Sequence, residues 1–289
     1  MHNSWYPNSV TQWLTITSGI VTVIGVPLTF LLGLNAVDPP AYAWVMAIFM
    51  SAFCFVIFAA LVVEEFRWRR KVRYGEAQDQ LHLAYHQLRD AHYALSRDQD
   101  ETIIIGMLQQ AVAHFSTAMS VIAGVSCRCC VKEIIYENED RPASIYNAAV
   151  RTIARSSLAD TSRDQRKRGE YDRISDNSDF RVLFDDTGAT CYAQGDITKV
   201  QGYQNSHADQ GVKSLPYRSV CVWPVKKRLL GSDGLDDDLL GFLCVDSKAT
   251  NAFRERYDEA LGAAFADTLY PLLRRMQNGM MQQRKADMM

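Results

Sequence analysis

Seven cysteines have the widest chemistry in this chain, because a thiolate can act as a nucleophile, a redox centre or a metal ligand. All but Cys54 lie beyond residue 120: Cys127, Cys129, Cys130, Cys191, Cys221 and Cys244. A structural zinc site takes four Cys and His ligands at fixed spacing, and these cysteines do not form that pattern. We expect thiols buried in strands, because free cysteine is among the most buried residue types. A redox or tetrapyrrole-linked cysteine is the alternative, and no cofactor is identified.

Charged clusters give a weaker signal. Asp233 and the aspartates at 236–238 lack the spacing of a calcium loop, so we expect a solvated turn. A basic cluster could receive a phosphate, although a solvated charge run is the favoured interpretation: Arg163, Arg166, Lys167 and Arg168. The sequence has no glycine-rich phosphate loop and no nucleophile elbow, which argues against an enzyme. With a net charge of −2, we expect no nucleic-acid partner.

The elements that must position these residues follow from hydrophobic patterning beyond residue 100. We expect an apolar helix from Glu101, strands at 127–136, 217–227 and 239–246, and a closing amphipathic helix at 251–276. Residues 150–156 form either a further strand or part of a helix. Antiparallel strands with helices at both ends predict an α+β domain. The two helices would cover one face of the sheet. The polar insert 157–214 would cover the other face and enclose a pocket.

The last part of this domain resembles the GAF domain family of small-molecule sensors. The residues that carry the resemblance are the strand 217–225, which ends in Trp-Pro-Val, the strand 240–247, which ends in Asp-Ser, and Phe253 with the helix after it. The resemblance covers 217–275 well and extends to 99–156. It is poor over 157–214, which corresponds to the ligand cover of the family. It implies an antiparallel sheet with flanking helices and a small-molecule ligand of unknown identity.

The expected pocket lies between the strand 217–227 and the insert. Alternation along a strand places every second residue of this strand on one face. Seven residues are the candidate ligand-binding set: Asp185, Asp186, Thr190, Tyr192, Ser219, Cys221 and Trp223. The pattern does not say which face of the sheet the insert covers.

Two charge-free apolar stretches occupy 13–34 and 41–63. About 20 apolar helical residues span the hydrocarbon layer of a bilayer. The linker 35–40 contains two prolines, so we predict a transmembrane helical hairpin. A pair of buried helices, or a signal peptide in the first stretch, is the alternative.

Charge after the second stretch predicts the orientation. Five Lys or Arg residues lie within 67–73, whereas the linker has none and carries Asp38. The positive-inside rule then places both the N-terminus and the C-terminal domain in the cytoplasm. We expect a multi-pass protein of the bacterial cytoplasmic membrane, with the lipid bilayer as a partner.

Residues 64–98 predict a long helix with a heptad seam. The seam alternates Ala with larger residues: Tyr74, Ala77, Leu81, Ala84, Leu88, Ala91 and Leu95. Either this stalk forms a coiled coil with a second copy, giving a homodimer or higher homo-oligomer, or it lies on its own domain. We expect an almost unbroken helix from Glu64 to about Val125.

These patterns divide the chain into an N-terminal tail 1–12, a two-span hairpin 13–63, a helical stalk 64–98, a GAF-like sensor domain 99–277 and a flexible tail 278–289. The predicted function is a membrane-anchored cytoplasmic sensor of a small molecule, for example a nucleotide. It would signal through its hairpin or through self-association, as a membrane-perturbing defence effector would. A cysteine-dependent redox enzyme and a scaffold without a ligand are the alternatives.

Overall fold

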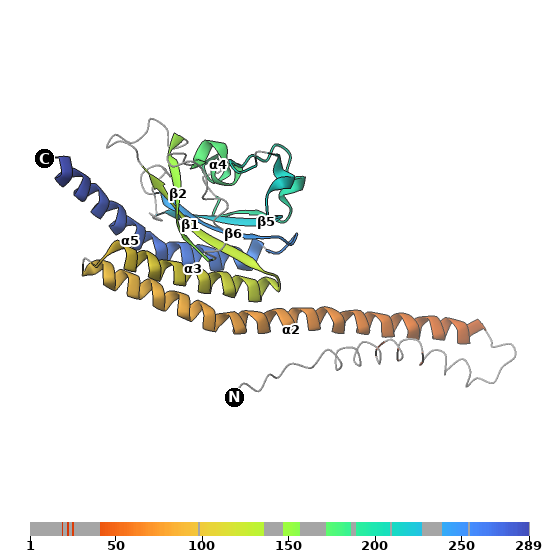
Figure 1. Cartoon of the computed structure of the whole chain (residues 1–289). Coiled ribbons are helices and arrows are strands. Elements are labelled where there is room, and N and C mark those ends of the chain that lie inside the picture. The colour runs from red at the N-terminus through yellow and green to blue at the C-terminus, as the bar shows by residue number, and fades with distance from the viewer. Residues whose placement is uncertain are drawn as a thin grey trace. The chain divides into compact units, whose positions relative to one another are not determined.

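The computed structural model describes residues 19, 22, 25, 41–97, 99–135, 147–156, 172–185, 189–208, 210–226, 239–253 and 255–288. Figure 1 draws the whole chain. The chain divides into two compact units, Met1–Val72 and Arg73–Met289. The long helix α2 (Ala41–Ser96) contains residues of both units.

The first unit contains one described helical segment that is long and apolar enough to cross a membrane. This segment is Trp44–Glu65, with a mean hydropathy of 2.7, and none of its most apolar window is buried. Large side chains such as Phe49 and Phe53 are exposed. Apart from Gly19, Thr22 and Gly25, which are helical, the first apolar stretch lies outside the described residues. The two-span hairpin therefore stays a prediction.

The second unit is built on one six-stranded sheet. Its strands are β1 (Cys127–Ile135), β2 (Ala149–Arg155), β3 (Asp172–Arg173), β4 (Tyr192–Gln194), β5 (Ser219–Lys226) and β6 (Leu239–Ser247). They lie in the order β3-β2-β1-β6-β5-β4, and every described pair is antiparallel. Pro224 lacks an N–H, yet β5 accommodates it, because β4 pairs with β5 only over Val220–Val222.

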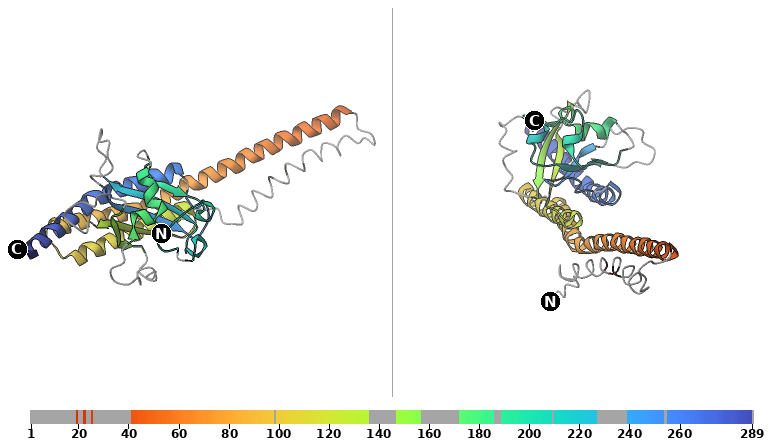
Figure 2. Two further views of the ribbon diagram at one scale, coloured as in Figure 1. Left: turned by 90° about the horizontal axis from the view of Figure 1, so that it is seen from above. Right: turned by 90° about the vertical axis from the view of Figure 1, so that its right-hand side faces the viewer.

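Two long helices cover one face of this sheet, as Figures 1 and 2 show. They are α3 (Glu101–Ala123) and α5 (Glu255–Met288). We call this side the helix face. Trp223 lies at its centre, fully buried, and its Nε1 donates a hydrogen bond to the Glu259 carbonyl 2.9 Å away. Gly262 packs against the indole, where a Cβ would collide with the ring.

The C-terminal part of α2 packs on the same helices. The seam residues Ala77, Leu81, Ala84, Leu88 and Ala91 are buried in the same hydrophobic cluster as residues of α3 and α5. Tyr85 and Phe265 have ring centroids 5.8 Å apart, and Tyr74 donates a 2.8 Å hydrogen bond to Asp258. Of the two interpretations of the heptad seam, the structure thus favours a helix that lies on its own domain. While it packs there, the seam is unavailable to a second copy.

The almost unbroken helix expected from Glu64 to Val125 is wrong. Helix α2 ends at Ser96 and α3 begins at Glu101, capped by Asp100, whose side chain accepts a hydrogen bond from Thr102 N. The His114 ring lies 3.0 Å from Gln80 Oε1, and a Cβ on Gly124 would meet Arg73. The contact later in α3 is made with the residue earlier in α2. The two helices therefore run in opposite directions and form an antiparallel hairpin.

The opposite face of the sheet carries α4 (Ser178–Asp185) and three short 3-10 turns, η3 (Ile174–Asp176), η4 (Ile197–Lys199) and η5 (Val212–Ser214). We call this side the cavity face. Phe180 of α4 stacks on Phe242 of β6, with ring centroids 4.3 Å apart. The expected α+β architecture is confirmed, with terminal helices on one face and the irregular segment on the other (Figure 1).

Candidate functional site

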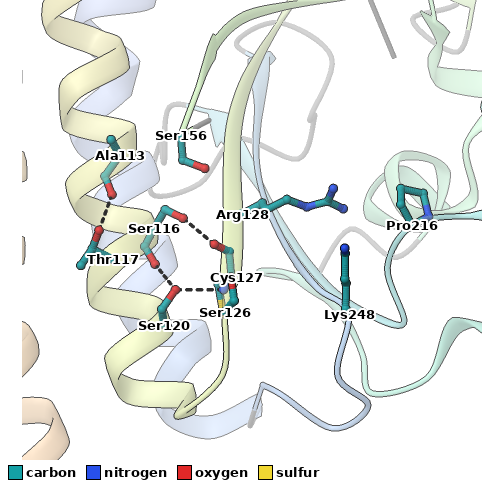
Figure 3. Close-up of a pocket in the computed structure, with 10 residues that line it drawn as sticks. All are labelled: Ala113, Ser116, Thr117, Ser120, Ser126, Cys127, Arg128, Ser156, Pro216 and Lys248. Atoms are coloured by element: carbon teal, nitrogen blue, oxygen red, sulfur yellow. Dashed lines mark hydrogen bonds between the residues drawn. The ribbon is translucent and has the colours of Figure 1, made fainter. Parts of the chain in front are cut away.

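One cavity in the second unit lies where α3 meets β1. Its volume is about 620 Å³, and Figure 3 shows its lining. Ser116 Oγ donates to the Cys127 carbonyl at 2.8 Å, and Ser120 Oγ accepts from Cys127 N at 2.9 Å. Arg128 is bound to Asp246 at 2.6 Å. The Ser116 and Ser120 hydroxyls therefore hold the C-terminal part of α3 to β1, and the cavity lies beside this contact.

The second cavity is much smaller, about 50 Å³, and lies on the cavity face. Ionisable residues from separate segments meet there, among them Lys132, Asp172, Asp179 and His207, with Arg155 and Asp246 also in the lining. Cys130 of β1 and Cys244 of β6 also line it. Lys132 comes from β1, Asp172 from the short edge strand β3 and Asp179 from α4, so the fold brings together residues that are distant in sequence.

Asp172 is the centre of a buried network. Lys132 Nζ lies 3.0 Å from Asp172 Oδ2, and His207 Nε2 lies 3.1 Å from the same oxygen. Ser206 Oγ donates to Oδ1 at 2.7 Å. Burial alone would raise the pKa of Asp172, but the His207 hydrogen bond and the Lys132 charge outweigh it and hold the pKa well below its usual value. The carboxylate therefore stays ionised throughout the physiological range.

Asp179 differs from Asp172 because it has no cationic partner of its own among the described contacts. Its side chain is buried, and Oδ1 accepts a 3.1 Å hydrogen bond from Phe180 N. Burial raises the pKa of Asp179 to about 6, although the Lys132 charge and the backbone hydrogen bonds oppose the rise. This carboxyl can therefore change its protonation state close to neutral pH, and a cavity carboxyl with such a shift is a candidate for function.

Three tyrosines lie in the same layer. Tyr203 and Tyr217 have hydroxyl oxygens 3.2 Å apart, and Asn205 Nδ2 donates to the Tyr217 hydroxyl. Among the described residues, the buried Tyr192 hydroxyl has no hydrogen-bond partner. Burial raises the pKa of Tyr192 and of Tyr203, and the nearby Asp179 charge acts in the same direction. Tyr192 does not line the small cavity, so its hydroxyl is a buried polar group beside the site and not part of the lining.

A buried ion pair on the helix face can be compared with the Lys132–Asp172 pair. Glu133 follows Lys132 in β1, is almost fully buried and pairs with Arg151 of β2. Burial raises the pKa of Glu133, and Arg151 opposes the rise. Neither cavity is lined by this pair. Buried ion pairs contribute little net stability, so the richer network around Asp172 calls for a reason beyond folding.

The structure does not bring together the seven residues expected to bind the ligand. Cys221 and Trp223 belong to the core of the helix face, whereas Tyr192 packs on the cavity face. Ser219 is buried and donates to the Ala249 carbonyl at 2.8 Å, and Thr190 bonds to Glu259 of α5. Asp185 ends α4, and Asp186 lies outside the described residues. A ligand-binding role for any of the seven stays a prediction.

The sequence left open which face of β5 the insert covers, because strand alternation is symmetric. It puts Ser219, Cys221 and Trp223 on one side of β5, but the large indole needed the space between helices that Gly262 leaves open. Val220 and Val222 take the cavity face instead. Lys132, Asp172, Asp179 and His207 were not among the residues expected to bind the ligand. The available signal was Lys132 within a strand rich in Cys, Val and Ile, since a charge buried in a sheet needs a partner.

The expectation of buried strand cysteines is confirmed for Cys127, Cys129 and Cys221, which belong to the helix-face core. Burial raises the pKa of each of these thiols. Cys130 and Cys244 are half-buried on the other face. In the part of the chain that the structure describes, no cluster of three or more His, Cys, Asp or Glu residues could hold a metal ion.

No protein-family model and no curated protein matches the chain. Among solved structures, it is similar to the type II free methionine-R-sulfoxide reductase from Thermoplasma acidophilum, at 15% identity over 50% of this chain and 77% of that chain, with a TM-score of 0.32. The GAF domain of an Acinetobacter phosphoenolpyruvate-protein phosphotransferase is similar at 12% identity over 68% and 95%, with a TM-score of 0.39. The GAF domain of the corresponding Coxiella burnetii protein is similar at 10% identity over 71% and 98%, with a TM-score of 0.40. Similarities of this size assign neither a family nor an activity.

Proposed function

We propose that this chain is a membrane-anchored sensor whose second unit is a GAF-like domain that binds a small polar molecule on the cavity face. The observation that carries the proposal is the meeting of Lys132, Asp172, Asp179 and His207 around one cavity. On the helix face, β1 contributes only the Glu133–Arg151 pair, whereas on the cavity face it contributes Lys132 to a larger charged network. Shifted ionisable groups in a cavity are typical of functional sites.

The size of the cavity sets a condition on the ligand. Pockets for drug-sized molecules usually measure about 300–1,000 Å³, and this cavity measures about 50 Å³. A ligand larger than a few atoms must therefore displace α4 and the 3-10 turns that cover the sheet. A nucleotide would need a larger opening still. Such a displacement supplies the two arrangements, with different ligand affinity, that any sensor needs.

The cover is built in a way that suits such movement. Helix α4 has only eight residues, and β3 and β4 at the two edges of the sheet have two and three. Short elements with few buried contacts open at lower free energy than a core helix does. The Phe180–Phe242 stack and the Ser178–Gln204 hydrogen bonds hold the cover closed in the structure.

The membrane anchor is proposed from α2 and the charges that follow its apolar part. Trp44–Glu65 is long enough to span a bilayer, and its large apolar side chains are exposed. A Cβ on Gly19 would lie 2.5 Å from the Phe58 ring, and small residues of this kind allow membrane helices to approach closely. The five Lys and Arg residues within 67–73 favour a cytoplasmic domain in a bacterial inner membrane.

The output is proposed to pass through α2, because this helix contains residues of both units. Its buried seam would respond to the sensor domain by changing how it packs on α3 and α5. A defence effector, in which released seams cluster hairpins and perturb the bilayer, is one specific form of this proposal.

Native mass spectrometry of the full-length protein in detergent tests the ligand-binding proposal. We expect the wild type to retain a small molecule that Lys132→Met loses, because Lys132 lines the cavity and forms an ion pair with Asp172 at its centre. Asp176→Asn is a matched control, since Asp176 is exposed and lies three residues before Asp179. Retention of the molecule by Lys132→Met, or a bare wild-type protein, would contradict the proposal.

A further inference from the structure

Cys130 and Cys244 lie directly opposite each other on neighbouring strands. They are register partners in the antiparallel β1–β6 pair, and their thiols share a hydrogen bond. Cβ atoms of directly opposed residues are about 4.5–5.5 Å apart, and small adjustments bring such a pair to the separation of a disulfide. Both side chains line the small cavity and are half-buried, so they are reachable from it.

The surroundings make the two thiols unequal. The hydrogen bond from Cys244 lowers the pKa of Cys130 to about 7, against the effect of burial, and the Lys132 and Arg155 charges act in the same direction. Asp246 opposes them. The same hydrogen bond and burial raise the pKa of Cys244. Because the thiolate is the nucleophile, Cys130 is the attacking group and Cys244 is the thiol held beside it.

The cavity beside this pair admits small reagents only. Its volume of about 50 Å³ is enough for a few water-sized molecules. Hydrogen peroxide is close to water in size and polarity, and Lys132 and Arg155 line the same space. These cations would stabilise the negative charge that develops on the departing oxygen.

We propose that Cys130 and Cys244 form a reversible dithiol–disulfide site that is oxidised by small hydroperoxides. The Cys130 thiolate attacks one peroxide oxygen, an S–O bond forms, the O–O bond breaks, and the departing oxygen takes a proton and leaves as water or an alcohol. The Cys244 thiol then attacks the sulfur of this sulfenic acid, the S–S bond forms, and a second water leaves with the Cys244 proton. In total, two thiols and one hydroperoxide give one disulfide, one water and one water or alcohol.

The cysteines of the helix face provide the internal contrast. Cys129 precedes Cys130 in β1 but points to the opposite side, where it is buried in the core. Cys221 is buried there as well, and burial raises the pKa of both thiols. Neither lines the small cavity. We therefore expect peroxide to leave them reduced while it oxidises Cys130. This site goes beyond the proposed sensing function, because its oxidation needs no other ligand.

The test uses the full-length protein in detergent, reduced and then treated with hydrogen peroxide. Differential alkylation and peptide mapping by mass spectrometry follow each cysteine. We expect the wild type to lose two hydrogens and to form a Cys130–Cys244 disulfide that dithiothreitol reverses. Cys130→Ser should form no disulfide, and its rate of thiol loss should fall about tenfold or more. Cys244→Ser should stop at a sulfenic acid on Cys130 that dimedone traps. Cys191→Ser, which removes another half-buried thiol, should behave as the wild type does.

Three results would overturn the proposal: retention of both thiols in the wild type, a disulfide between other cysteines, or unchanged thiol loss in Cys130→Ser. Mapping of the wild type alone decides between the first two and the expected result, so the test survives even if a variant fails to fold. The retained molecule in the native mass spectrum is a separate readout. Failure of the redox site would therefore leave the ligand-binding proposal standing, and the reverse also holds.

Discussion

The two faces of the sheet are made from the same strands, yet they differ in almost every physical property. On the helix face, Trp223, Phe115 and Phe265 form a closed core, and burial raises the pKa of the cysteines there. On the cavity face, Lys132 and Asp172 form an ion pair beside a cavity, and Cys130 is a thiol with a lowered pKa. Successive residues of β1 point to opposite faces, so neighbours in this strand lie in different environments. The helix face is therefore a closed core, whereas the cavity face combines a hydrophobic cluster of its own with a charged cavity.

Removal of Trp223 should give the largest loss of stability. Trp223→Ala empties a fully buried site on the helix face and removes the hydrogen bond to Glu259, so we expect a loss of about 3–5 kcal/mol in the free energy of unfolding. Urea unfolding in detergent, followed by far-UV circular dichroism, measures it. A loss below about 1 kcal/mol would show that the helix face is not the stabilising core.

Truncation of the α2 seam should cost nearly as much. Leu88 is almost fully buried against the other helices, and Leu→Ala at such a site costs about 2–5 kcal/mol. Leu83→Ala is the matched control, because Leu83 is exposed on the same helix. We expect Leu88→Ala to lower the free energy of unfolding at any protein concentration. A loss that appears only as a weaker dimer would favour the intermolecular coiled coil instead.

Asp179 should give the cavity face its own dependence on pH. Its pKa in the folded protein, about 6, exceeds its ordinary value of 3.8, so the folded state binds more protons than the unfolded state between these values. This carboxyl therefore destabilises the protein progressively as pH rises from about 4 to 6 and then constantly above it. Asp179→Asn should remove up to about 3 kcal/mol of that destabilisation above pH 6.

The difference in unfolding free energy between Asp179→Asn and the wild type, measured at several pH values, checks this expectation. The difference should become smaller below about pH 6 and level off near pH 4. Asp172 does not interfere, because its lowered pKa makes its own contribution disappear only below its ordinary pKa, near 3.8. A difference that stays constant between pH 4 and 7 would contradict a carboxyl that titrates in this range.

The smallest loss of stability is expected where α3 contacts β1. Ser120→Ala removes the acceptor of Cys127 N and the donor to the Ser116 carbonyl, so we expect a loss of about 1 kcal/mol in unfolding free energy. Thr117→Ala is the control, since its hydroxyl bonds only within α3. If Ser120→Ala instead abolished retention of the small molecule with stability unchanged, the larger cavity would be the binding site.

The sequence predicted the elements whose patterns are local. The heptad seam from Tyr74 to Leu95 and the strands around Trp223 and Leu243 follow from spacing alone. It did not predict that the chain turns back between Ser96 and Glu101, although Asp100 and Thr102 form a cap there. No local pattern distinguishes a seam that is covered by its own domain from one that is covered by a second copy.

The candidate site was less predictable, for a related reason. Lys132, Asp172, Asp179 and His207 come from four segments, and only the order of the strands brings them together. β3 has two residues and carries no strand signal of its own. The opposition of Cys130 and Cys244 depends on the register between β1 and β6, which spacing within either strand does not define.

The central claim, that the cavity face and not the helix face is the sensing surface, is tested most directly by hydrogen–deuterium exchange. The full-length protein in detergent is compared with and without the molecule that it retains. We predict that removal of the molecule changes exchange most in the cover, at 174–185 and 197–208, and less in α3 and α5, on which the α2 seam packs. Increased exchange confined to α3 and α5, with the cover unaffected, would contradict the account.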